Sequence, residues 1–171
     1  MVKNITGKGI TEKKYYLFAA LRIALGWIFF WAFLDKLLGL GFSTAPDKSW
    51  IQGSSPTAGF LQFGTSGPLG PLFQSLADSV AVEWLFMLGL LLIGLALLLG
   101  IGMKIASYSG IVLMILMWLA LLPPKNNPLI DEHIIYALAL WGLRVVKSGQ
   151  VWGLGAWWSR TPLVRKYPFL E

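Results

Sequence analysis

The stretch EWLFMLGLLLIGLALLLGIGMKIASYSGIVLMILMWLALL, residues 83–122, decides the fold of this chain. It consists of two almost uninterrupted apolar runs, 83–100 and 105–122, joined by the turn sequence Gly100-Ile101-Gly102-Met103-Lys104. Each run has the length, roughly 17–25 residues, that an α-helix needs to cross ~30 Å of hydrocarbon. The stretch therefore predicts two membrane-spanning helices that form a tight antiparallel hairpin.

Two further apolar stretches, 15–34 and 129–146, flank this hairpin and also fit a membrane span. The Pro-Pro pair at 123–124 ends the preceding helix, and the Asn-Pro pair at 127–128 suits the N-cap and first position of the last helix. The sequence therefore predicts an all-α integral membrane protein. We expect a four-transmembrane-helix bundle in which residues 1–171 form a single membrane domain.

Two segments of different composition lie outside these helices. Residues 35–82 are rich in Gly, Pro, Ser and Thr, which break regular helix. Their scattered apolar residues predict short pieces that lie at the membrane interface or pack over the bundle. This segment is expected to be a long outer loop between the first two helices. The tail, 147–171, interleaves Trp with Gly and is expected to lie in the headgroup layer as an interfacial segment.

Composition excludes several classes of protein. The chain is 56% apolar and 13% charged, whereas soluble domains carry about 25% charged residues, so a water-soluble protein is excluded. The absence of Cys removes thiolate metal sites and iron–sulfur clusters, and a single His argues against a His-rich metal site. We expect no metal and no intrinsic cofactor. The net charge of +6 is interpreted as a topology signal rather than as a nucleic-acid surface.

The positions of the cations predict the orientation in the membrane. Ten of the fourteen Lys and Arg residues share one predicted side: Lys3, Lys8, Lys13, Lys14, Lys104, Arg144, Lys147, Arg160, Arg165 and Lys166. Cytoplasmic loops collect Lys and Arg. We therefore expect a multi-pass protein of the cell (plasma) membrane with both termini in the cytoplasm and residues 35–82 outside.

Small residues mark predicted helix contacts. Gly89, Ala96 and Gly100 recur on one stripe of the 83–100 helix, which predicts the close approach of another helix there. Gly26 lies one turn after Arg22 on the same helix face and leaves space above its guanidinium for a partner helix or a ligand.

Arg22 is the one charge inside the first apolar stretch, where an unpaired cation costs at least about 2.5 kcal/mol. Two interpretations stay open. In the functional one, Arg22 contacts an anion or a polar headgroup. In the structural one, it snorkels to the headgroups or caps the carbonyls of a neighbouring helix.

The densest ionisable group is predicted at the outer ends of the first and last helices, where Asp35-Lys36 would meet Asp131-Glu132-His133, with Tyr136 one turn below Glu132. An imidazole, carboxylates and a Lys are the groups that deliver protons to a quinone or bind a polar anion. The alternative is that Asp131 and Glu132 favour the positive end of the helix dipole and that Asp35-Lys36 mark the aqueous boundary.

Three stretches resemble the DoxX family of small four-helix membrane proteins, whose relatives include the DoxD-like subunit of thiosulfate:quinone oxidoreductase. They are LRIALGW at 21–27 leading to FLDKL at 33–37, WLFMLG at 84–89 leading to GIG at 100–102, and LPP at 122–124 leading through NNP at 126–128 to DEH at 131–133. The resemblance carries over Arg22, Gly26 and Lys36. It implies a quinone-linked or redox-accessory role.

The first functional hypothesis is a membrane subunit of a redox complex, in which a quinone or a thiosulfate-type anion is the substrate. Its catalytic residues would be His133, Glu132 and Asp131, and the substrate would be bound by a second set: Arg22, Lys36, Asp35 and Tyr136. The expected partners are the lipid bilayer and a redox protein, with a homo-oligomer as an open alternative. The rival hypotheses are a non-catalytic scaffold or assembly subunit and, third, a small transporter or channel.

Overall fold

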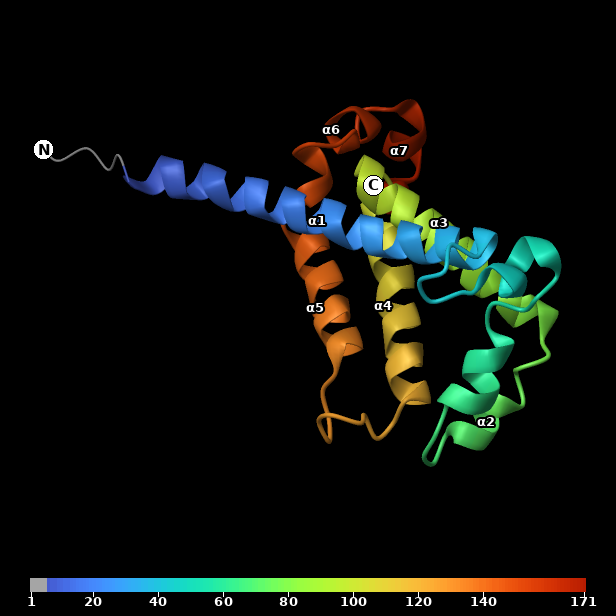
Figure 1. Ribbon diagram of the computed structural model, residues 1–171. Helices are drawn as coiled ribbons and strands as arrows, with labels where there is room; N and C mark the ends of the chain where they lie inside the picture. Colours follow the sequence, from blue (N-terminus) through green and yellow to red (C-terminus); the bar gives the residue numbers. More distant parts are fainter. Residues whose placement is uncertain (1–5) are drawn as a thin grey trace, which may run out of the picture.

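The computed structural model describes residues 6–171, with side chains from Lys13 onward, and this part of the chain forms helices and no strand (Figure 1). The predicted all-helical class is confirmed. The predicted inner-side cations Lys3 and Lys8 lie outside the described side chains. The four long helices are α1 (Thr6–Leu38), α3 (Val80–Leu99), α4 (Met103–Ala120) and α5 (Glu132–Val145). The short ones are η1 (Pro46–Lys48), η2 (Trp50–Gln52), η3 (Phe60–Gly64), α2 (Gly70–Gln74), η4 (Ser148–Gln150), α6 (Gly155–Trp158), α7 (Pro162–Lys166) and η5 (Pro168–Leu170).

Three helical segments are long and apolar enough to cross a membrane: Lys13–Leu38, Val80–Leu99 and Met103–Ala120. They give the chain the character of an integral membrane protein. Helix α5 has only 14 residues, about 21 Å at 1.5 Å per residue, which is short of the ~30 Å hydrocarbon layer. The predicted fourth span, 129–146, is therefore not confirmed as a span.

Helix α5 begins later than the predicted residue 129 because its N-cap is Asp131, not Asn127. The Asp131 carboxylate accepts a hydrogen bond from the backbone N–H of His133, which satisfies one of the free donors of the first turn. The Asn127 side chain instead accepts from the backbone N–H groups of Leu129 and Ile130, 2.9 and 3.0 Å away. It closes a local turn before the helix starts.

Helix α1 ends later than predicted. It continues through Asp35 and Lys36 to Leu38, because the Asp35 carboxylate is turned back onto the chain rather than into water. Asp35 is 1% exposed and accepts hydrogen bonds from the backbone N–H of Phe42 and from both the N–H and the hydroxyl of Ser43. This charge fixes the exit of the chain from α1 and does not mark an aqueous boundary.

The long helices form two packed pairs. Helix α1 packs mainly on α3, and α4 packs mainly on α5, while Figure 1 shows α1 crossing α4 and α5 rather than running alongside them. All four contribute to one apolar core: Leu25, Phe29, Leu90, Ile93, Leu97, Met103, Met114, Ala137, Leu140 and Leu143. The four-transmembrane-helix bundle predicted from the sequence is not confirmed: the long helices form two crossed pairs around a shared core.

Contact between α1 and α3 depends on two glycines. A Cβ added at Gly26 would lie 2.9 Å from the backbone N of Leu98, and one at Gly94 would lie 2.7 Å from the backbone N of Phe30. Both positions therefore need a residue without a side chain. The predicted contact at Gly89 is wrong, since a Cβ there meets nothing within 4 Å.

The predicted tight turn between α3 and α4 is confirmed. Gly100 and Gly102 adopt the left-handed conformation, with φ of 73° and 59°, which glycine enters without steric cost. From this turn the two helices diverge (Figure 1), and their far ends are covered by the chain between α1 and α3. There the Trp50 indole donates a hydrogen bond to Glu83, and the backbone N–H of Ser66 donates to Ala120. That segment consists of short helical pieces packed on the long helices, one of the two arrangements that the sequence left open, and the predicted long loop is not confirmed.

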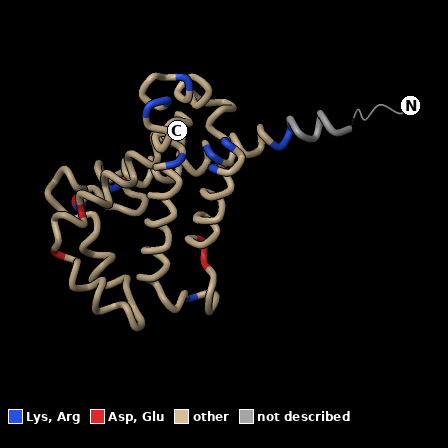
Figure 2. Tube along the Cα trace, turned by 180° about the vertical axis from the view of Figure 1, so that it is seen from behind, with Lys and Arg blue, Asp and Glu red and all other residues tan. Residues whose placement is uncertain are grey.

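The C-terminal tail lies at the opposite end, over the α3–α4 turn. The backbone N–H of Leu154 donates to the Leu99 carbonyl, and that of Lys104 donates to the Glu171 carbonyl, 2.8 and 2.7 Å away. Figure 2 shows Lys and Arg concentrated at this end, with acidic residues along the far side and at the start of α5. The charge segregation seen in the sequence is thus also present in space.

Candidate functional site

Arg22 is completely buried where α1 crosses the end of α3. Its Nη1 donates to the carbonyls of Leu97 and Leu98, 2.5 and 3.2 Å away. Its Nη2 donates to the carbonyls of Val151 and Trp152, 3.1 and 2.8 Å away. One guanidinium therefore joins three separate parts of the chain: α1, the end of α3 and the start of the tail.

These bonds complete the hydrogen bonding at the end of α3. The last four carbonyls of a helix lack intrahelical partners. Here the Ala96 carbonyl accepts from Gly100, those of Leu97 and Leu98 accept from Arg22, and that of Leu99 accepts from Leu154. The contacts are those of a cation that caps a neighbouring helix, one of the two alternatives that the sequence left open. A substrate could reach the guanidinium only if these bonds broke.

The group at the start of α5 forms a local unit. Asp131 Oδ2 lies 2.9 Å from Nδ1 of His133, while its Oδ1 accepts from the His133 backbone, so the imidazole is held by the same carboxylate that caps the helix. Glu132 is exposed, and Tyr136 is half-buried against the core. One ligand atom from each of residues 131, 132 and 133 lies within 4.8 Å of the others, as successive residues of one helix start allow.

The two halves of the predicted outer cluster do not meet. Asp35 and Lys36 lie in the last turn of α1, beside the chain that leads to α3, whereas Asp131, Glu132 and His133 lie at the free end of α5 (Figures 1 and 2). The crossing of α1 over the α4–α5 pair separates the ends that a parallel bundle would have brought together. The sequence left a pocket shared by Lys36 and His133 possible; the cavity that Lys36 lines does not include His133.

An apolar cavity of about 630 Å³ lies between the diverging helices α3 and α4. The segment between α1 and α3 covers it with aromatic and aliphatic side chains. Representative lining residues are Phe60 and Phe73 from this segment, Leu85 and Gly89 from α3, and Val112 and Leu116 from α4. Its size is within the ~300–1,000 Å³ of small-molecule sites, whose linings are mostly apolar with few polar groups.

Lys36 is the one charged residue that lines this cavity within the described chain. It is half-buried, and among residues 13–171 it makes no hydrogen bond or ion pair that would occupy its three donors. Thr57, Tyr108 and Ser109 add hydroxyl groups to the lining. The arrangement can hold an apolar molecule and donate hydrogen bonds to an oxygen at one end of it.

Sequence reasoning named Lys36 but missed the cavity. The lining residues come from four segments that only the fold brings together, so no local pattern contains them. Gly89 was the available signal, because a small residue in an otherwise large-residue helix marks either a close contact or an open space. The choice between these depended on where α3 and α4 separate.

Comparison with protein-family models, with curated proteins and with solved structures found no match.

Proposed function

We propose that this protein is a DoxX-like membrane subunit of a redox complex and that it binds a quinone in the α3–α4 cavity. The observation that supports the proposal is the cavity itself: an apolar space of about 630 Å³ between two membrane helices, with Lys36 as its charged residue. In this function the quinone ring enters between α3 and α4, and the Lys36 ammonium donates a hydrogen bond to a ring carbonyl. Electrons come from a partner protein.

A quinone suits this cavity better than a sulfur anion. An apolar lining contributes to binding in proportion to the apolar surface that it removes from water, at about 25 cal/mol per Å². A doubly charged, strongly hydrated anion such as thiosulfate would lose its hydration against Leu85, Val112 and Leu116 and would gain one cation. The sulfur-anion alternative from the sequence is therefore the weaker proposal for this site.

The proposed topology keeps four spans with both termini in the cytoplasm of a plasma-membrane protein. Helix α5 supports the fourth span because it is apolar on two faces. Leu140 and Leu143 face the core, while Leu138, Trp141 and Val145 are exposed, as lipid contact requires.

Two substitutions test the quinone site. Gly89→Leu puts a side chain into the cavity, at a position where an added Cβ meets nothing within 4 Å. It should weaken binding of a short-chain ubiquinone or menaquinone analogue at least about tenfold, or 1.4 kcal/mol. Lys36→Gln removes a charge-assisted hydrogen bond and should weaken it by roughly 10- to 100-fold. The measurement is equilibrium binding to the purified chain in lipid nanodiscs.

Matched controls separate the cavity from general effects. Gly142→Leu introduces the same side chain on α5, also into open space, and Lys48→Gln removes an exposed Lys from η1, in the segment that follows α1. Both should bind the quinone analogue as the natural chain does. Wild-type affinity in Gly89→Leu and Lys36→Gln would exclude this cavity as a quinone site and favour the scaffold alternative.

The topology is tested by single introduced cysteines, since the chain has none. An impermeant thiol reagent added to intact cells should label position 54, in the proposed outer segment, and should leave positions 3 and 166 unlabelled. Labelling at 3 or 166 would overturn the proposed orientation.

The scaffold alternative has its own support. Arg22 and Asp35, two of the predicted substrate ligands, are both buried and occupied by hydrogen bonds within the chain. Under this alternative they stabilise a frame for partner proteins. The scaffold alternative would be favoured if a co-purifying redox protein were lost from the Gly94→Leu variant but retained by the Gly89→Leu variant.

A further inference from the structure

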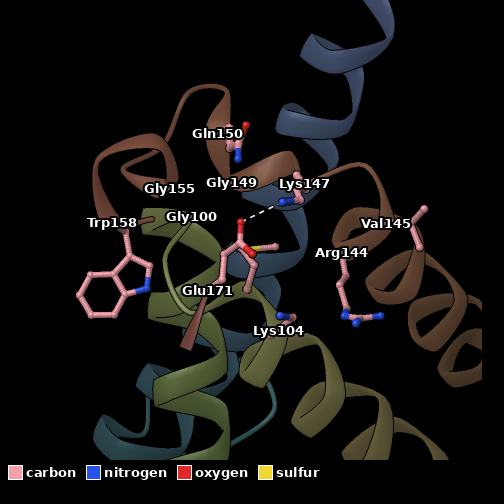
Figure 3. A pocket seen from close by; sticks show the side chains of 11 residues that line it. Gly100, Lys104, Arg144, Val145, Lys147, Gly149, Gln150, Gly155, Trp158 and Glu171 are labelled. Carbon is pink, nitrogen blue, oxygen red and sulfur yellow. Dashed lines mark hydrogen bonds and ion pairs between the residues drawn. The ribbon is translucent and has the colours of Figure 1, made fainter. Parts of the chain in front are cut away.

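A second cavity, of about 320 Å³, lies at the other end of the molecule and is lined by cations (Figure 3). Lys104 comes from the start of α4, Arg144 from the last turn of α5, and Lys147 from the residues just after α5. Among the described residues that line this cavity, Glu171 is the one acidic residue. Three cationic side chains against one carboxylate leave a surplus of two positive charges in a concave site.

The existing partners do not use up these cations. Lys147 Nζ lies 3.0 Å from a Glu171 oxygen, which is the pair joined by a dashed line in Figure 3, and Lys104 Nζ donates to the Pro168 carbonyl, 2.9 Å away. Arg144 stacks on the ring of Tyr108, with 4.6 Å between the guanidinium carbon and the ring centroid. Its buried Nε has no hydrogen-bond partner among the described residues. A buried donor without an acceptor favours binding of an anion.

The place of the cavity indicates the kind of anion. Helices α3 and α4 are candidate membrane spans, and the cavity lies at the turn that joins them, where a spanning hairpin meets the headgroup layer. Basic pockets between membrane helices bind the phosphate groups of lipids. Trp158 also lines the cavity, and Trp is typical of this interfacial depth.

An apolar path leads away from the cations along α4. Ile105, Tyr108, Val112 and Leu116 are all exposed, and their spacing of three, four and four residues puts them on one helix face. This face starts one residue after Lys104 and continues for about 16 Å at 1.5 Å per residue. It offers a surface for an acyl chain attached to a bound phosphate.

We propose that this cavity binds the phosphate of an anionic phospholipid through Lys104, Arg144 and Lys147, with an acyl chain along the exposed face of α4. Glu171 lies in the same space as an internal carboxylate that competes for Lys147. The three cations of this site line no part of the quinone cavity, so the phosphate site does not depend on the function proposed for that cavity. The acyl-chain path shares Tyr108, Val112 and Leu116 with the quinone cavity. It would anchor the α3–α4 turn and the end of α5 to the same lipid.

The test uses the full chain in mixed phosphatidylcholine and phosphatidylglycerol, followed by native mass spectrometry of the retained lipid. Phosphatidylglycerol should be retained over phosphatidylcholine, and Arg144→Gln and Lys147→Gln should each lower its retention at least fivefold, about 1 kcal/mol. Glu171→Gln removes the competing carboxylate and should raise it. Arg160→Gln, the same change at an exposed cation outside the cavity, should match the natural chain.

A competition experiment distinguishes a lipid phosphate from a free phosphate. Inorganic phosphate and glycerol phosphate should not displace the bound phosphatidylglycerol, because they lack the acyl chain. Equal retention of both lipids, or an equal loss in Arg160→Gln, would overturn the proposal, and displacement by inorganic phosphate would overturn its lipid part. If Arg144→Gln fails to fold, the exposed Lys147 gives the decisive variant, since its described ion pair is with Glu171 alone.

Discussion

The two helix pairs are packed by different means. Between α1 and α3 the backbones themselves meet, at Gly26 and Gly94, and a buried Arg22 joins the ends. Between α4 and α5 a side chain fills the space, since a Cβ at Gly110 would meet the tip of Leu140 at 2.8 Å. Backbone cannot move aside without shifting a whole helix, whereas a leucine can change rotamer. The α1–α3 pair is therefore expected to be rigid and the α4–α5 pair adaptable.

The largest effect is expected from Arg22→Leu. It removes four hydrogen bonds from a charged donor to carbonyls that are otherwise without partners. Each such bond contributes roughly 1.5–3 kcal/mol, so a loss of at least about 3 kcal/mol in the free energy of unfolding is expected. Unfolding in mixed micelles of increasing dodecyl sulfate measures it. Arg160→Leu, at an exposed cation, is the control, and equal stability of the two variants would contradict the structural role.

The second effect tests the rigid pair directly. Gly94→Ala puts a Cβ 2.7 Å from the Phe30 backbone N, which forces α1 and α3 apart. Overpacking of this kind costs about 1–3 kcal/mol, and the upper half of that range is expected here. Gly89→Ala makes the same change on the same helix in open space and should be neutral or slightly stabilising. If both variants unfold alike, the α1–α3 contact is not tight.

A smaller effect is expected at the start of α5. Asp131→Ala removes the N-cap and the partner of the His133 ring, and loss of an N-cap costs about 1 kcal/mol. Asp131→Asn keeps an acceptor and should restore most of that stability. Circular dichroism during the same detergent titration follows it. Equal losses in the Ala and Asn variants would indicate that the charge, rather than the cap, matters.

The smallest effect is expected in the adaptable pair. Gly110→Ala should cost less than about 1 kcal/mol, because the contacted atom is the end of the Leu140 side chain and can rotate away. The double variant Gly110→Ala with Leu140→Ala measures the coupling between the two positions. A loss for Gly110→Ala as large as that for Gly94→Ala would remove the distinction between the pairs.

Much of the local structure could be predicted from the sequence. The helical class, the approximate positions of the long helices and the glycine turn between α3 and α4 all follow from nearby residues. One charge was placed wrongly. Asp35 was predicted as a substrate ligand, or alternatively as a marker of the aqueous boundary, but it is buried and holds the chain after α1 through Phe42 and Ser43. The burial of Asp35 depends on how the chain that follows α1 folds back over it.

The sites were less predictable because their members are far apart in the chain. Lys36 was named as a ligand residue, but its expected neighbour His133 lies elsewhere, and its actual surroundings are apolar side chains of α3, α4 and the covering segment. Lys104, Arg144 and Lys147 were predicted to lie on one side and were not predicted to share a cavity. That these cations lie on the same side of the membrane follows from the alternating direction of the spans. That they line the same cavity depends on how the helix ends pack.

By itself the sequence determined that this chain has membrane helices and where the tight turn between α3 and α4 lies. The free energy of inserting a helix is a sum over consecutive residues, and the left-handed turn needs glycine at fixed positions, so both are local properties. Only the tertiary structure decided that Arg22 caps α3, that the helices form two crossed pairs, and that one cavity opens beside Gly89 and another beside Arg144. These features depend on how surfaces from distant parts of the chain fit together. Arg22 and its acceptors, for example, are 75 or more residues apart in the sequence. No single segment of the sequence determines shape complementarity of that kind.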